Sequence, residues 1–173
     1  SYAGNSVDPS SLPEHTSEFY INDFANILDS DTKSYILSNS KVLDDATTAQ
    51  VVVATVKSLE GYSIDDYALN LGRKWGIGNK EKNNGLLILL ATDDRKVKIE
   101  VGQGLEGAIN DGKAGRLLDN YAIPYFKNDD WQNCIKNLYN ATLKEVYAEY
   151  NLDLPENVAK AETKGSSIGT SLF

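Results

Sequence analysis

Apolar and polar positions along the chain follow two different periods, and the period indicates where strands and helices lie. Residues 50–56 (QVVVATV) and 86–92 are short, nearly continuous apolar runs, typical of strands buried on both faces. In residues 97–101 three β-branched side chains alternate with Lys98 and Glu100, which predicts a strand with one covered face. A buried pair of strands and a half-buried third strand are therefore expected.

Other segments carry apolar residues at a spacing of three and four, which predicts amphipathic helices. Their expected starting points are Asp29 or Ser30, Ser63, Ala114, and Asp129 or Asp130. The second helix joins the first two of these strands, so they should run parallel with a right-handed crossover. The turn at residues 93–96 is too short for a crossover, so the next strand should be antiparallel. Residues 19–24 form either a short strand or a lead-in to the sheet edge.

These elements predict an α/β fold: a three-layer α/β/α sandwich around a small mixed sheet. The sheet would contain one parallel strand–helix–strand unit and one hairpin, with about four helices. Residues 1–18 are polar with two prolines and predict an extended or mobile N-terminal arm. Residues 19–152 form the predicted domain, and residues 153–173, with glycine and serine near the end, predict a C-terminal linker.

The charge balance narrows the class of partner. The net charge is −8, from 25 acidic and 17 basic residues, and no stripe concentrates the basic ones. This argues against a nucleic-acid partner and is compatible with either a bound divalent cation or simple solubility. With one cysteine, Cys134, and one histidine, His15, neither an intrachain disulfide nor a zinc site is expected. Cys134 lies in a helical pattern and is expected to be a small buried side chain.

Several phrases in order point to a known family: VVVATV, SLEGYSIDDYA, RKWGIGNKEKNNGLLILLA, DDRKVKIEVGQGLEG and IND. Over roughly residues 18–150 the chain resembles the TPM domain family, which includes the thylakoid lumen phosphatase-type proteins. The resemblance implies an α/β/α sandwich and a mostly extracytoplasmic family, often with a membrane anchor. Some members are acid phosphatases, some bind calcium or magnesium, and some assist photosystem repair or receptor assembly, so no single activity follows.

The family's recurring polar pattern falls on six positions, with Asn110 where relatives often carry threonine or serine. They are Asp23, Asp94, Arg95, Glu100, Glu106 and Asp111. Hard cations such as Ca2+ or Mg2+ prefer several oxygen ligands. The candidate metal ligands are therefore Asp23, Asp93, Asp94, Glu106 and Asp111. Arg95 and Glu100 are candidates for holding a phosphate or forming an ion pair.

Topology divides the candidate metal ligands into two groups. Asp23, Asp93 and Asp94 should lie at the carboxyl ends of the parallel strands, where open α/β sheets bind ligands. Glu106 and Asp111 should lie at the opposite end unless their loop folds back. The alternatives are structural: Asp93 and Asp94 as turn residues paired with Arg95, Asp111 as a helix cap, and Glu106 in an ion pair.

Residues 102–107 (GQGLEG) formally match the glycine pattern of dinucleotide-binding loops. That reading requires the first strand of a parallel unit to open directly into a helix. Here the preceding strand is the second arm of a hairpin, so the glycines are expected to serve a tight turn.

Two functions remain open. The first is an extracytoplasmic, membrane-tethered interaction or accessory domain that binds a divalent cation and, as a monomer, a protein partner at the cell envelope. The second is a metal-assisted acid phosphatase acting on phosphate monoesters, although the chain has no Cys-x5-Arg or Walker-type loop.

Overall fold

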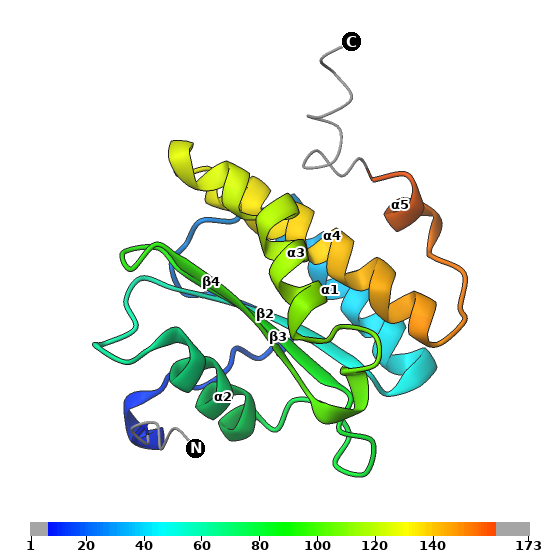
Figure 1. The fold of residues 1–173 in the computed structure, drawn as a ribbon, viewed down its shortest axis with the longest axis horizontal. Coiled ribbons are helices and arrows are strands. Elements are labelled where there is room, and N and C mark those ends of the chain that lie inside the picture. Colours follow the sequence, from blue (N-terminus) through cyan, green and yellow to red (C-terminus); the bar gives the residue numbers. More distant parts are fainter. Residues whose placement is uncertain (1–6, 162–173) are drawn as a thin grey trace.

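The computed structural model of the chain describes residues 7–161 and forms one mixed sheet with helices on both faces (Figure 1). The strands are β1 (Ile21–Asp23), β2 (Gln50–Val56), β3 (Gly85–Ala91) and β4 (Lys96–Val101). The α-helices are α1 (Ser30–Thr47), α2 (Ile64–Trp75), α3 (Asp111–Tyr121), α4 (Trp131–Glu149) and α5 (Glu156–Ala159). Three 3-10 helices complete the list: η1 (Pro9–Ser11), η2 (Gln103–Leu105) and η3 (Ile123–Asn128).

The sheet has the order β1-β2-β3-β4, with the first three strands parallel and β4 antiparallel. Val53 lies opposite Ile21 on one side and Ile88 on the other. The parallel unit and the hairpin predicted from the sequence are confirmed, and the short apolar segment near residue 20 is strand β1. The carboxyl ends of β1, β2 and β3 therefore share one edge of the sheet.

Side chains alternate between two cores along each central strand. In β2, Val51 and Val53 pack with α1, α3 and α4, whereas Val52 and Ala54 pack with α2. Figure 1 shows α1, α3 and α4 on one face of the sheet and α2 on the other. This arrangement confirms the predicted three-layer sandwich. Cys134 of α4 is fully buried in the larger core, and burial raises the pKa of its thiol to about 12.

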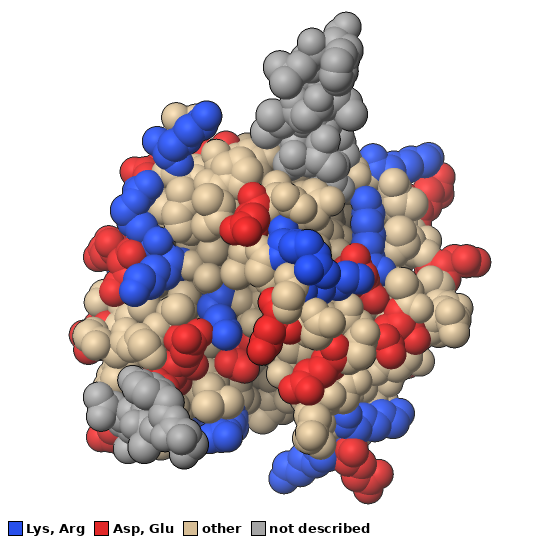
Figure 2. Space-filling view, viewed as in Figure 1, with Lys and Arg blue, Asp and Glu red and all other residues tan. Residues whose placement is uncertain are grey.

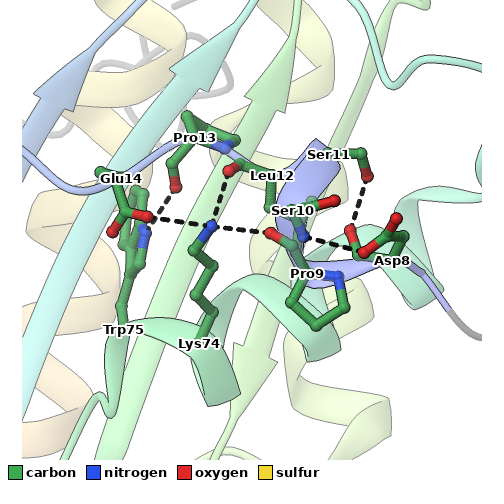
Figure 3. Close-up of polar contacts among 9 residues, drawn as sticks. All are labelled: Asp8, Pro9, Ser10, Ser11, Leu12, Pro13, Glu14, Lys74 and Trp75. Atoms are coloured by element: carbon green, nitrogen blue, oxygen red, sulfur yellow. Dashed lines mark hydrogen bonds and ion pairs between the residues drawn. The ribbon is translucent and has the colours of Figure 1, made fainter.

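The segment before β1, for which the sequence predicts an extended or mobile arm, packs on α2. Val7 and Leu12 are buried in the core shared with α2. The ammonium of Lys74 donates to the carbonyls of Pro9 (2.7 Å) and Leu12 (2.8 Å), and it lies 3.2 Å from the Glu14 carboxylate (Figure 3). The indole of Trp75 donates to the Pro13 carbonyl at 2.9 Å. The described part of the arm is thus a strap held by the last turn of α2.

The C-terminal segment also packs on the domain as far as it is described. Val158 of α5 is 0% exposed and belongs to the core of α1, α3 and α4. Residues 1–6 of the expected arm and residues 162–173 of the expected linker lie outside the described residues.

Candidate functional site

Asp23 ends β1 and organises the chain that leaves the sheet. Its Oδ1 accepts hydrogen bonds from the Thr55 hydroxyl (2.6 Å) and the Ile27 amide (3.1 Å), and its Oδ2 accepts from the Leu28 amide (2.9 Å). Thr55 in turn accepts a bond from the Ala25 amide at 3.1 Å. Both carboxylate oxygens are therefore used to fix the β1–α1 loop against β2.

Asp93 and Asp94 lie at the same edge of the sheet, as topology predicts. The Asp94 carboxylate accepts from the Leu59 amide at 3.1 Å, and the Asp93 amide donates to the Lys57 carbonyl at 2.8 Å. Both side chains are exposed. This geometry ties the β3–β4 turn to the loop after β2 and agrees with the turn role left open by the sequence.

Arg95 reaches away from this turn toward η3 and α4. It donates to the Asp129 carboxylate and, at 2.6 Å, to the Phe126 carbonyl. Its guanidinium also lies over the Trp131 ring, 5.3 Å from the ring centroid. The sequence suggests an ion pair between Arg95 and Asp93 or Asp94. In the fold, the carboxylate partner of Arg95 is Asp129, 34 positions further along the chain. Arg95 clamps the hairpin to the helical layer.

The opposite end of the sheet holds a cavity of about 690 Å³. Its walls are the second half of α2, the loop that follows it, the start of β3, the end of β4, and η2. The polar and charged side chains that line it are Arg73, Asn79, Lys80, Asn83, Glu100, Gln103 and Glu106. Leu69 and Ile77 supply apolar wall. The cavity has the size and the mixed lining of small-molecule sites.

Glu100 is the half-buried acid of this cavity. Its side chain points to the α2 face because Ile99 and Val101 take the other side of the strand. Burial raises the pKa of the Glu100 carboxyl, opposed by the nearby positive charges of Lys98 and Arg73 and reinforced by Asp65 and Asp111. The neighbouring Lys98 is 3.0 Å from Asp65 of α2. No hydrogen bond or salt bridge to the Glu100 carboxylate is found within the described residues.

Glu106 lines the cavity, but Asp111 does not. Asp111 is the first residue of α3, and Asn110 is the cap whose side chain accepts from the Lys113 amide at 2.8 Å. The capping role considered for Asp111 thus belongs to its neighbour. An acidic residue in the first helical turn remains favourable because of the helix dipole.

The glycines of residues 102–107 allow the chain to approach another segment closely. A Cβ on Gly102 would lie 2.4 Å from the Asn83 carbonyl oxygen, and one on Gly104 would lie 1.9 Å from that of Lys82. The Gly104 amide donates to the Asn83 carbonyl at 2.9 Å. Neither glycine has a positive φ. The expected tight turn is thus a close contact between η2 and the loop before β3, and this contact forms one end of the cavity.

Sequence reasoning missed Arg73, Asn79 and Lys80 as site residues. The phrase GIGNK at residues 76–80 was a signal: Gly76 and Gly78 have φ values of 61° and 94° and turn the chain sharply after α2. Asn79 then folds back, its amide donating to the Asn84 side chain at 2.9 Å. Periodicity assigns such a segment only to a loop, although it forms a wall of the cavity.

The candidate metal ligands remain in two groups at opposite ends of the sheet. Among residues 7–161 no group of three or more histidine, cysteine, aspartate or glutamate side chains is placed to hold a metal ion. Within the same range, no helix is both long and apolar enough to span a membrane. On the face seen in Figure 2, basic and acidic side chains are interspersed.

The fold and the cavity define an α/β/α domain with a ligand-sized hollow beside its antiparallel edge strand. Residues 21–145 match the TPM domain, so the chain belongs to the TPM domain family. A comparison with curated proteins finds no match.

Solved structures similar to this chain include domains from three organisms. The N-terminal domain of a P. gingivalis protein has a TM-score of 0.75 and 25% identity, covering 88% of this chain and 99% of that one. The N-terminal domain of a Corynebacterium glutamicum protein has a TM-score of 0.55 and 16% identity, covering 82% and 88%. The BA42 protein of Bizionia argentinensis has a TM-score of 0.59 and 16% identity, covering 71% and 83%. The last two share the fold alone.

Proposed function

We propose that this TPM domain is an interaction domain that works outside the cytoplasm, tethered to the membrane, and that it binds its ligand without turning it over. The observation that carries the proposal is the contrast between the two ends of the sheet. Asp23 and Arg95, which a metal-assisted phosphatase would need for its cation and its phosphate, already hold parts of the fold together. The cavity at the other end carries charged side chains that the fold does not use.

Hydrolysis of p-nitrophenyl phosphate, with and without EDTA, tests this proposal against the alternative. We expect no turnover that depends on a metal. Turnover that is lost with chelator, and lost again in a folded Asp94→Asn variant, would overturn the proposal and establish the metal-assisted phosphatase.

The divalent cation is a separate part of the proposal and rests on the family resemblance. It is tested by a thermal melt in EDTA and then in millimolar Ca2+ or Mg2+. A site filled a hundredfold above its dissociation constant should add ~2.7 kcal/mol of stability. An unchanged melting temperature with both ions would remove the cation and leave the interaction domain standing.

The location and the tether also rest on the resemblance. Protease added to intact cells that express the full-length protein should cleave the domain if it lies outside the cytoplasm. Protection until the membrane is broken would contradict that location.

A further inference from the structure

The cavity between α2 and β4 is lined by both basic and acidic side chains that the fold leaves unpaired in the described part of the chain. Two neighbouring lysines already have partners: Lys74 donates to carbonyls of the N-terminal strap, and Lys98 forms a salt bridge with Asp65. In the cavity, the side chains of Arg73, Glu100 and Lys80 have no hydrogen bond or salt bridge within the described residues. Burial raises the pKa of Glu100 and the positive charge of Arg73 opposes this rise, although the two side chains form no salt bridge.

Half-burial removes some of the hydrogen bonds that water makes to the Glu100 carboxylate, which makes its negative charge less favourable. An ammonium group bound beside Glu100 would restore those bonds and neutralise the charge. The Arg73 guanidinium, which also lines the cavity, would bind a carboxylate of the same ligand in a bidentate geometry. A ligand with a single charge would satisfy one of these groups and be repelled by the other.

We propose that the cavity binds a short peptide with both termini free, its ammonium group on Glu100 and its carboxylate on Arg73. This proposal rests on the proposed function and adds the class of ligand to it. Leu69 and Ile77 offer apolar wall for one aliphatic side chain. A volume of about 690 Å³ leaves room for two or three residues in addition to the charged ends.

The edge of β4 supplies main-chain partners next to the cavity. The Gly102 amide donates to the Gly85 carbonyl at 2.8 Å, so the even-numbered residues of β4 bond to β3. The amides and carbonyls of Val97, Ile99 and Val101 therefore face outward, and no backbone partner for them is found among the described residues. Val101 also lines the cavity. The backbone of a peptide held between Glu100 and Arg73 can pair with this edge at Val101.

The test uses three related probes on the full chain: the dipeptide Ala-Leu, its N-acetyl form and its C-terminal amide. Binding is followed by amide chemical shifts in a 1H–15N NMR titration. Ala-Leu should shift the amides of residues 76–85 and 100–103 in a saturable way. Each blocked form should bind about tenfold more weakly, the scale of one charge-assisted hydrogen-bond pair.

Two variants assign the ends of the ligand. Arg73→Gln should weaken Ala-Leu about tenfold and leave the amide form unchanged, because that form lacks the carboxylate. Glu100→Gln should weaken Ala-Leu and leave the N-acetyl form unchanged. Arg116→Gln and Glu60→Gln, which remove exposed charges outside the cavity, are the matched controls and should change neither.

Equal binding of the three probes, or no saturable shift at these residues up to about 10 mM Ala-Leu, would overturn the proposal, since such a Kd corresponds to under about 3 kcal/mol. Phosphate-monoester turnover is a separate readout. The interaction domain can therefore survive the loss of its peptide ligand, and its own failure would be seen independently.

Discussion

At the scale of single residues, the carboxylates of Asp23 and Glu100 differ in whether they hold the fold together. Both carboxylate oxygens of Asp23 accept hydrogen bonds, from the Thr55 hydroxyl and from two backbone amides. Glu100, by contrast, is half-buried and has no hydrogen-bond partner in the described part of the chain. Both match the recurring polar pattern of the family, but their environments give them different tasks.

Asp23→Asn should lower the free energy of unfolding by about 1–3 kcal/mol, because one amide oxygen cannot replace two carboxylate oxygens and a backbone amide loses its acceptor. Urea unfolding followed by circular dichroism measures the loss. Asp93→Asn removes an exposed charge from the same edge of the sheet and should change stability by less than about 0.5 kcal/mol. Equal effects of the two substitutions would contradict the structural role of Asp23.

Glu100→Gln should raise stability at neutral pH. The raised pKa means that the folded state holds the Glu100 proton more tightly than the unfolded state, whose pKa is about 4.3. The contribution of Glu100 is therefore fully present below that pH and is lost as the pH rises through the folded-state pKa. Lys98, Arg73, Asp65 and Asp111 are the charges that act on it.

Thermal melts of both proteins from pH 3.5 to pH 8 measure this effect on either side of the unfolded-state pKa of about 4.3. The melting temperature of the variant should exceed that of the native protein at pH 8, and the difference should shrink toward acid pH. A difference that stays constant across the range would show that the carboxyl group does not titrate as its burial requires.

At the scale of elements, close contact between η2 and the loop before β3 shapes the cavity. Gly104→Ala would place a Cβ 1.9 Å from the Lys82 carbonyl oxygen, so the backbone of one segment must move. The expected cost is about 1–3 kcal/mol, typical of overpacking against rigid neighbours. It should be accompanied by amide shifts in residues 82–85.

The matched control is Gly115→Ala in α3, where an added Cβ meets no atom within 4 Å. Alanine is the better helix former by about 1 kcal/mol, so this variant should be as stable as the native protein or more stable. If both alanine substitutions were equally tolerated, the close approach of the two segments would be wrong.

The same scale shows how far the sequence could predict the structure. Periodicity identified the strands and the long helices because each buries a regular face of its own, and chain connectivity then set the parallel unit and the hairpin. It also placed Asp23 and Asp94 at one end of the sheet and Glu106 at the other. The cavity left no periodic signal, because its walls come from helix α2, an irregular loop and a strand edge. The Arg95–Asp129 pair joins distant loops, which local patterns do not report.

At the scale of the whole molecule, the strap packs on α2, the helix on the face of the sheet opposite α1, α3 and α4 (Figure 1). Val7 and Leu12 complete a core that α2 covers only in part, and Lys74, whose side chain is 17% exposed, satisfies two strap carbonyls (Figure 3). Because α2 also forms a wall of the cavity, the strap and the cavity share one support.

If the strap belongs to the cooperative unit, Leu12→Ala should lower global stability by about 2–5 kcal/mol, since Leu12 is 4% exposed. Leu152→Ala makes the same substitution at a side chain that is 41% exposed and should cost less than about 0.5 kcal/mol. Urea unfolding read by tryptophan fluorescence and by circular dichroism should give one coincident transition for each protein. A strap that detached on its own would instead leave global stability unchanged in Leu12→Ala, and the cooperative domain would then begin nearer to β1.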